Sequence, residues 1–430
     1  MVEYREVKHM KRHAGTKWAL GVLVILAVLA VVSPSGAADT IKMGIMYSLT
    51  GPGAVLGKLQ EEGAKLAIKD INDAGGVDVG GKKMLIEAIF RDDETKPEVA
   101  IGRLKEMVKD QGAVAVVGGT FGHVSMAVNN EAKKTKVFFM ATNGVPDDFF
   151  KKDVKAPTAV CNVAGAGDAG RAAAAYMAEK MKAKKVVCFM PDYAIGKATL
   201  AGFEVAIKRY PDVKYEVIWH PVNSPDLTPF LIKAAEAEPD VVFMGSWGGD
   251  AVNALKQAKE LGLSKKGKIF HFWLVNVFAT GIPPDAMEGV WSQMFWYHDM
   301  RGFKDEAVVK ASQEFTDKYV KAYKNPPDPY AMTAYFGVKE VARAIQLAKS
   351  TDPVKVYEAL MANPDWTGVK GPATWRKDGR SMYKYFTWIV EGKGAGARKS
   401  DRYDASYDYA KITDVYEGTA FAPTLEEEGY

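Results

Sequence analysis

The sequence predicts an α/β protein built on parallel sheets. Short apolar runs alternate with segments of helical periodicity over most of the first 300 residues. The alternation restarts after Pro157, so two successive sets of strands and helices are expected. Strands that alternate with helices form parallel sheets covered on both faces, and their ligands bind at the carboxyl ends of the strands. We therefore expect two α/β lobes with a cleft between them.

The first unit of this pattern spans residues 41–77. Apolar residues alternate with others over 41–47, which predicts a strand, and the Gly- and Pro-containing stretch 48–53 predicts a turn. A helical pattern follows and ends at Gly75 and Gly76, which favour a helix stop. A small, polar loop that opens a helix directs backbone N–H groups at one point, so this unit suits a small anionic or polar ligand.

The later elements follow from the same two periodicities. Further strands are predicted at 84–90, 113–117, 137–140, 185–190, 215–219, 241–245 and 269–273. Further helices are predicted at 97–110, 125–134, 168–181, 195–210, 227–237, 250–261, 304–323, 330–349 and 353–361. The loops expected to face a ligand are 48–53, 118–123, 141–145, 191–195, 245–249 and the stretch after 273.

Residues 1–38 have the pattern of a secretory signal peptide. Five Lys or Arg residues precede an uncharged apolar run over 19–32, and small residues lead to a cleavage site after Ala38. The alternative is an uncleaved membrane anchor, for which the apolar run is short. No Cys follows the run, so we expect a periplasmic protein that is not lipid-anchored.

Charge and cysteine content exclude several classes of function. The formal charge is +4, and loss of the leader would reduce it to about +1, which argues against nucleic acid or an anionic membrane as a partner. Only Cys161 and Cys188 are present, so this is no disulfide scaffold. Both lie in apolar strand-like runs, which favours buried thiols over a bridge between them.

Several segments together resemble a known family. SLTGPGAVLG, GAKLAIKDINDAGGV, FRDDETKPEVA and VVGGTFGHVS occur in the order seen in type I periplasmic binding proteins, and PDYAIGKA, FMGSWGGDAVNALKQAKELGL and GPATWRKDGR fit as well. Over roughly 40–390 the chain resembles the branched-chain amino acid-type substrate-binding proteins of ABC importers (the leucine/isoleucine/valine-binding type).

The resemblance implies the domain organisation. Two Rossmann-like lobes would be joined by three crossovers and would close on a ligand by a hinge motion. The N-terminal lobe would comprise 39–161 plus 298–372, and the C-terminal lobe 162–297 plus 373–390. The remainder, 391–430, is rich in Gly, Lys, Asp and Tyr and is expected to be a surface tail.

The resemblance also implies ligand contacts in the first lobe. Phe121, Gly122 and His123 stand where a pair of serines is common in the family. Gly122 keeps a backbone donor, and His123 could donate to an anion or could have no ligand role. Ser125 is expected to be the N-cap of the helix that follows. Asn143 and Gly144 stand where the family offers backbone groups to the ligand, although Asn-Gly is also an ordinary turn.

Three further candidates belong to the second lobe. Asp168 matches the acidic residue that opens a helix in the amino-acid binders, and it could equally act as a capping residue. Tyr193 lies two residues before Ile195, where the family commonly has an aromatic. Trp247, between small residues in GSWGGD, matches an aromatic that closes over the ligand.

One departure from the family concerns the ligand's ammonium group. Amino-acid binders of the family pair it with a carboxylate after the strand predicted at 269–273, but 268–284 contains no Asp or Glu. Trp273 or Asn276 would lie near that place. A buried ammonium without a paired carboxylate is costly, so an aromatic or otherwise apolar carboxylate becomes a candidate ligand beside an amino acid.

The resemblance implies the solute-binding component of an ABC importer. Its partners would be a small-molecule ligand and the permease subunits in the membrane, and we expect a monomer without metal or cofactor. A ligand sensor of the same fold remains an alternative. A secreted hydrolase has little support, because the chain has neither HExxH nor GxSxG, and no catalytic residues are assigned.

Overall fold

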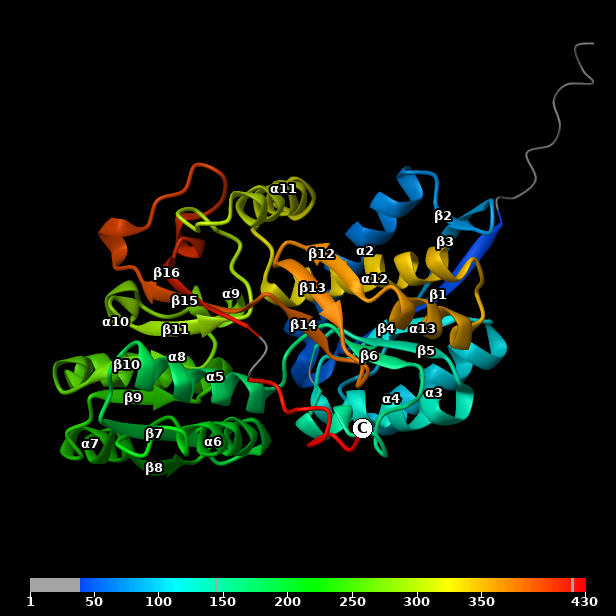
Figure 1. Cartoon of the computed structure of the whole chain (residues 1–430). Coiled ribbons are helices and arrows are strands. Elements are labelled where there is room, and N and C mark those ends of the chain that lie inside the picture. The colour runs from blue at the N-terminus through cyan, green and yellow to red at the C-terminus, as the bar shows by residue number, and fades with distance from the viewer. Residues whose placement is uncertain (1–38, 144, 419–420) are drawn as a thin grey trace, which may run out of the picture. The chain divides into compact units, whose positions relative to one another are not determined.

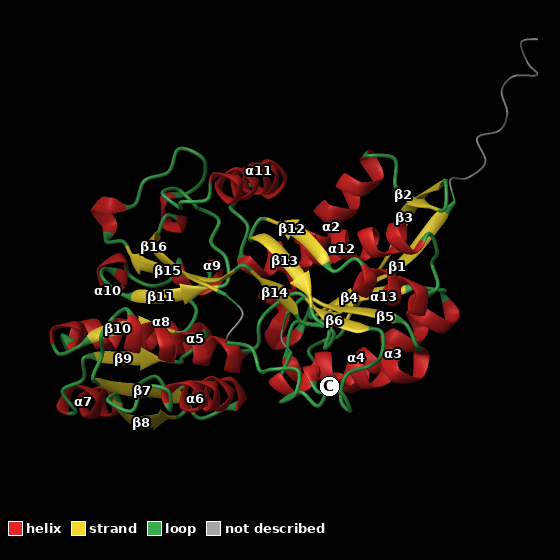
Figure 2. Ribbon diagram, in the orientation of Figure 1, coloured by secondary structure: helices red, strands yellow, loops and turns green. Residues whose placement is uncertain are grey.

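The computed structural model describes residues 39–143, 145–418 and 421–430, and the predicted signal peptide lies outside the described residues. Two larger sheets and one small sheet organise the chain (Figure 1, Figure 2). The first sheet has the order β2 (Val77–Val79), β3 (Lys82–Asp92), β1 (Thr40–Tyr47), β4 (Ala115–Gly118), β5 (Phe138–Ala141) and β6 (Ala159–Cys161).

The first sheet is parallel from β1 to β6, with an antiparallel hairpin of β2 and β3 at its edge. Every residue of β4 and β5 is buried, as expected of strands covered on both faces. Helices α2 (Ala54–Asp73) and α12 (Pro329–Ala348) lie on one side of this sheet, and α3 (Pro97–Lys105) and α4 (Gly122–Thr135) on the other (Figure 1).

The second sheet has a parallel centre and an antiparallel edge. Its order is β16 (Ala410–Glu417), β15 (Tyr385–Gly392), β11 (Trp291–Met294), β10 (Lys268–His271), β9 (Val241–Met244), β7 (Lys185–Pro191) and β8 (Lys214–His220). Its helices are α5 (Ala166–Glu179), α6 (Ala194–Ile207), α7 (Thr228–Glu236), α8 (Gly248–Glu260), α9 (Asn276–Ala279) and α10 (Pro284–Met287). The chain is therefore an α/β protein with parallel-dominated sheets, as the sequence predicts.

The later part of the chain contributes long helices and a small antiparallel sheet. Helices α11 (Glu306–Tyr323), α12 and α13 (Pro353–Ala362) each begin after an Asp whose carboxylate accepts backbone N–H groups of the first turn. This capping satisfies donors that have no partner within the helix. The small sheet consists of β12 (Asp365–Gly368), β13 (Gly371–Trp375) and β14 (Ser381–Tyr383).

Some local expectations were wrong. Ser125 is not an N-cap, because α4 already begins at Gly122 and Phe121 is its N-cap residue. The helix predicted over 97–110 is present over that range, as α3 to Lys105 and then as a π-helical turn, Glu106–Asp110. The tail is also more than a surface segment, because β16 pairs along the whole of β15 and Tyr409 just before it is fully buried.

Cys161 and Cys188 are free and buried, in agreement with the expectation of two separate thiols. Burial raises the pKa of the Cys161 thiol to about 12, so this thiol stays protonated at neutral pH. In the described part of the chain, no helix combines the length and the apolarity needed to cross a membrane.

Candidate functional site

The expected ligand loops leave the two large sheets at the carboxyl ends of their parallel strands. In the first sheet Gly118 pairs in register with Met46 and with Ala141, so the loops after β1, β4 and β5 start at one edge. In the second sheet Met244 pairs with Phe189 and with His271, so the loops after β7, β9 and β10 also start together. The strand register thus gathers these loops into two groups, one at each sheet.

Two adjacent carboxylates fix the loop after β1. The Asp92 carboxylate accepts hydrogen bonds from the backbone N–H groups of Leu49 (2.8 Å) and Thr50 (3.2 Å) and from the Thr50 hydroxyl (2.6 Å). Asp93 is fully buried and accepts from the Ser48 hydroxyl at 2.6 Å. Burial raises the pKa of Asp93, and the hydrogen bond from Ser48 opposes this shift.

The loop after β4 is held against the loop after β1 and against α2. The Ser48 backbone N–H donates to the Thr120 hydroxyl (3.2 Å), which donates to the Gln60 side chain of α2 (2.8 Å). Gly53 lies against Phe121, since a Cβ at Gly53 would stand 2.7 Å from the Phe121 ring. These contacts hold the two loops together without using any solvent-exposed group.

Phe121, Gly122 and His123 form the start of α4. Gly122 is the first residue of the helix, so its N–H is among those without a partner inside the helix. His123 is exposed, its Nε2 lies 3.2 Å from the Thr95 carbonyl oxygen, and its ring centre is 6.1 Å from that of Phe121. His123 is thus positioned by the Asp92–Lys96 turn.

Asn143 contacts Tyr330, a residue that was not predicted as part of the site. Asn143 is buried, and its backbone oxygen lies 3.5 Å from the Ser125 hydroxyl. Its side chain is hydrogen-bonded to the hydroxyl of Tyr330, the second residue of α12. Gly144, the other candidate in this turn, lies outside the described residues.

Tyr330 also contacts the second sheet's loops. Its ring centre is 6.2 Å from that of Trp247 and 6.3 Å from that of Phe295. Trp247 is half-buried and packs edge-on against Phe278, with 4.9 Å between ring centres. Burial is the largest cause of the raised pKa of Tyr330, so its hydroxyl is a neutral hydrogen-bonding group at physiological pH.

Tyr193 lies at the N-cap position of α6 and is partly buried. Burial, followed by the nearby Asp250, raises the pKa of its hydroxyl, and Tyr193 in turn contributes to the raised pKa of Tyr330. Asn143 and Trp247 therefore lie beside Tyr330, although they come from two different strand ends, and Tyr193 follows a third strand.

Asp168 is occupied by other partners. The side chain is buried, and its carboxylate pairs with Arg380 and accepts the backbone N–H of Gly165 at 3.1 Å. Asp168 thus has the capping role that the sequence left open as an alternative. Its pairing with a buried guanidinium leaves it poorly placed to neutralise a ligand ammonium.

Trp273 and Asn276 also serve the packing of the protein. Trp273 is 8% exposed and packs against Phe272 and Phe295, with ring centres 4.3 and 5.1 Å away. The Asn276 side chain donates to the Pro327 carbonyl (3.0 Å) and accepts from the Tyr409 hydroxyl (2.9 Å). These contacts connect the loop after β10 to the start of α12.

Two buried histidines stand close to the same strand ends. Burial lowers the pKa of His271 to about 3 and also lowers that of His220, whose Nε2 lies 2.9 Å from the Ser246 hydroxyl. Both rings are therefore neutral at physiological pH. The described residues include no group of three His, Cys, Asp or Glu side chains that could hold a metal ion.

The sequence did not point to Tyr330, Asp92 or Asp93 as parts of the site. Tyr330 appears in the sequence only as the start of a predicted helix, and Asn143 and Trp247, which it contacts, both lie more than 80 residues earlier in the chain. The Asp pair lies in the FRDDETKPEVA segment, but its role depends on the pairing of β3 with its neighbours. A polar pair directly after a strand was the one available signal.

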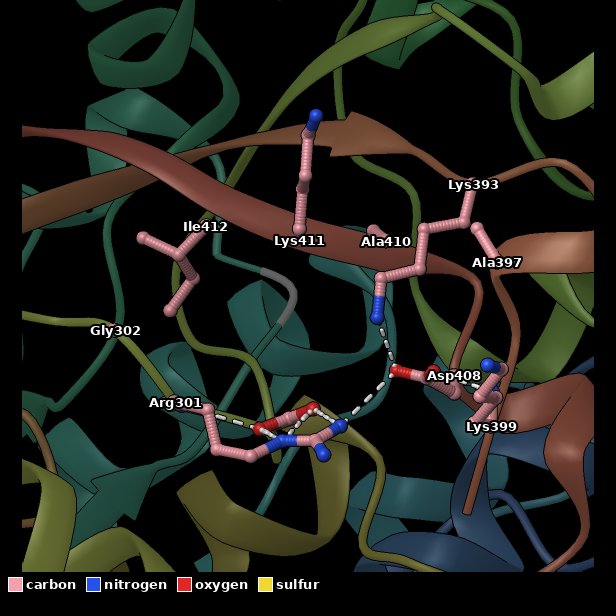
Figure 3. Close-up of a pocket in the computed structure, with 10 residues that line it drawn as sticks. Arg301, Gly302, Lys393, Ala397, Lys399, Asp408, Ala410, Lys411 and Ile412 are labelled. Carbon is pink, nitrogen blue, oxygen red and sulfur yellow. Dashed lines mark hydrogen bonds and ion pairs between the residues drawn. The ribbon is translucent and has the colours of Figure 1, made fainter.

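A separate pocket is lined by residues that follow β11 and by residues of the tail (Figure 3). It has a volume of about 440 Å³ and lies between the turn after β11 and the tail. Arg301 pairs with Asp299 and reaches Asp408 at 3.4 Å, and Lys393 pairs with Asp408 at 2.6 Å. The charged groups that face this pocket are therefore largely paired with one another.

Comparisons with known proteins agree with this architecture. A family model described as periplasmic binding protein matches residues 40–397. The leucine-, isoleucine-, valine-, threonine- and alanine-binding protein of Pseudomonas aeruginosa is 26% identical over 353 residues, which cover 81% of this chain and 89% of that protein.

Solved structures show the same fold. A substrate-binding protein of an amino acid ABC transporter from Pseudomonas fluorescens Pf-5 is similar with a TM-score of 0.79 and 21% identity, covering 91% of this chain and 99% of that one. A solute-binding protein of an ABC transporter from R. palustris, solved in complex with benzoate, is similar with a TM-score of 0.71 and 18% identity, covering 88% and 97% of the two chains.

Proposed function

Because the chain belongs to the periplasmic binding protein family, we propose that it is the solute-binding component of an ABC importer. In this role it captures a small carboxylate or amino-acid-like ligand between two closing lobes and delivers it to permease subunits in the membrane. It acts as a monomer in the periplasm, after removal of residues 1–38, and catalyses no reaction.

The grouping around Tyr330 is the observation that carries this proposal. Asn143 comes from a strand end of the first sheet, Trp247 from a strand end of the second, and Tyr330 contacts both. A ligand that touches both groups of loops favours a closed arrangement, because the open one gives it only half of these contacts. Binding and closure are therefore coupled.

The proposed ligand contacts fall into two kinds. Hydrogen-bond donors for a carboxylate come from the two strand-end loops of the first sheet, namely from Gly122, His123, Asn143 and Gly144. Phe121, Tyr193, Trp247 and Tyr330 supply apolar and aromatic surface for the rest of the ligand.

Within this proposal an apolar or aromatic carboxylate fits better than an α-amino acid. The segment 268–284 has no acidic residue, and the Asp168 carboxylate is already paired with Arg380. An α-ammonium in this site would be buried without an obvious partner, at a considerable cost in free energy. The benzoate-bound relative has the same fold, which supports a test of this ligand class.

Thermal unfolding with matched ligand pairs tests the proposal. Benzoate is compared with benzamide, and leucine with leucinamide, at equal concentrations. We expect carboxylates to raise the melting temperature, because a ligand at a hundred times its Kd stabilises the folded state by about 2.7 kcal/mol. A larger shift with benzoate than with leucine supports the aromatic class, and no shift with any small carboxylate or amino acid contradicts the proposal.

A further inference from the structure

The last ten residues, Phe421–Tyr430, form a segment that we call the strap. It lies beyond residues 40–397, which the family model matches. One end of the strap is anchored on the second sheet. The Phe421 ring stacks on Tyr416 of β16, with ring centres 4.6 Å apart, and contacts Phe386 of β15 at 5.3 Å.

The other end of the strap lies against the segment that follows β5 of the first sheet. The Lys152 backbone N–H donates to the Glu428 carbonyl oxygen at 2.9 Å. Glu428 is only 4% exposed, and its carboxylate accepts from the Arg380 guanidinium at 2.8 Å. The strap therefore spans from strands of the second sheet to a segment joined to the first.

Arg380 stands where the chain passes between the two sheets. The backbone N–H of Cys161, the last residue of β6, donates to the Gly379 carbonyl at 2.8 Å, and Cys161 forms an isolated bridge with Arg380. After Cys161 the chain enters α5, and after Arg380 it continues through β14 into β15. Two of the connections between the sheets, the segment after Cys161 and the segment at Arg380, thus lie side by side.

The Arg380 side chain joins parts of the chain that belong to both sheets. Its guanidinium pairs with Asp168 of α5 and with Glu428 of the strap, and it lies 3.7 Å from the centre of the Phe150 ring. The α5 helix packs on the second sheet, since the Ala169 carbonyl accepts from Gln293 of β11 at 2.9 Å. Phe150 lies in the segment between β5 and β6 of the first sheet.

Arg380 and Glu428 depend on each other as partners because both charged groups are buried. Burial raises the pKa of Glu428, and the Arg380 charge opposes that shift. A buried carboxylate without its partner is costly, so the strap cannot leave Arg380 without exposing Glu428 to water. Arg380 and Glu428 can therefore separate only if the end of the strap that carries Glu428 moves away.

We propose that the strap restrains the relative movement of the two sheets by holding Glu428 on Arg380 at their crossing. With the strap in place, the protein samples a narrow range of arrangements of the two sheets. Release of Glu428 frees one end of the strap and widens that range. This device does not depend on the identity of the ligand.

Pulsed electron paramagnetic resonance in the absence of ligand tests the strap. Spin labels are attached at K109C, beside the first sheet, and K256C in α8, both of which are exposed positions. The native Cys161 and Cys188 are buried and do not compete for the label. E428Q is compared with E426Q, which makes the same change at an exposed position two residues away.

We expect E428Q to broaden the distance distribution and to raise the population of minor arrangements about tenfold, equivalent to 1.4 kcal/mol, while E426Q leaves both unchanged. F421A frees the opposite end of the strap and is expected to broaden the distribution as well, so it serves as the test if E428Q does not fold. Wild-type distributions in the folded variants overturn the proposal. No ligand is present, so this result is independent of the binding proposal.

Discussion

Trp247 illustrates how a single side chain can be assigned to the site. It is half-buried at the end of β9, between Ser246 and Gly248, and faces Phe278 and Tyr330. The ring therefore stands between α9, which follows β10, and the start of α12, where its aromatic surface can serve a ligand held between the strand-end loops.

Substitution W247A is expected to weaken ligand binding at least tenfold, which corresponds to about 1.4 kcal/mol. The loss follows from the aromatic surface that the ring offers to an apolar ligand. W219A is the matched control, because Trp219 is exposed on β8. Calorimetric titration measures both variants, and unchanged affinity in W247A removes this residue from the pocket.

The sequence allowed Asn143, Tyr193 and Trp247 to be placed in loops at the carboxyl ends of predicted parallel strands, because each lies just after such a strand. It could not reveal that Asp168 is paired, since its partner Arg380 is 212 residues away in the chain. Tyr330 could not be predicted as a site residue for the same reason. Its position at the start of a long helix does not indicate which distant residues it contacts. Contacts between distant segments depend on the chain's return to the first sheet.

At the level of elements, the contact of α2 with α12 depends on a glycine. Gly63 of α2 lies against Ala331 of α12, and a Cβ at Gly63 would stand 2.0 Å from the Ala331 carbonyl oxygen. No side chain fits this space without a shift of one helix. The close approach of these helices holds Tyr330 in its position at the start of α12.

Substitution G63A is therefore expected to lower the free energy of unfolding by about 1–3 kcal/mol, as overpacking in a core does. Urea unfolding measures the change. G102A in α3 is the control, since a Cβ there meets nothing within 4 Å, and it should be neutral or stabilise the helix by about 0.5–1 kcal/mol. Equal stability of both variants contradicts the tight contact.

The predicted elements agree with the structure where periodicity is long and regular, as in α11, α12 and the buried strands β4, β5, β7 and β9. The predictions fail for short strands that form only because they pair with another strand. The Val77–Val79 strand, the small sheet β12–β14 and β16 in the tail exist because of pairing with neighbouring strands. Local residue pattern alone does not specify such pairing.

For the molecule as a whole, buried histidines predict sensitivity to mild acid. Burial lowers the pKa values of His271 and His298 to about 3, compared with about 6.5 in the unfolded chain. The unfolded state therefore binds these protons first. The stability that each neutral ring contributes is fully present above pH 6.5 and is lost as the pH falls from about 6.5 toward 3.

Substitution H298F is expected to reduce this acid sensitivity. Between pH 6 and 5 the free energy of unfolding of the wild-type protein should fall more steeply than that of H298F, by up to about 1.4 kcal/mol per pH unit. H123F, at an exposed histidine, should keep the wild-type slope. Urea unfolding at both pH values measures the slopes, and identical slopes for all three proteins contradict the assignment of a neutral buried His298.

The overall α/β architecture could be predicted because the segments that form the two large sheets repeat one strand-to-helix pattern. The grouping of the two sets of loops around Tyr330 could not, because it depends on how α12 returns beside α2. The lobe boundaries remain a prediction that rests on the family resemblance, as does closure of the lobes on a ligand.

The central claim is that one small carboxylate binds to each chain between the two groups of strand-end loops. Isothermal titration calorimetry of the purified protein with benzoate and leucine measures this directly. The account predicts saturable binding of at least one of them, with one site per chain and with the affinity reduced at least tenfold in W247A. The absence of saturable binding, or equal affinity in W247A and the wild-type protein, would contradict it.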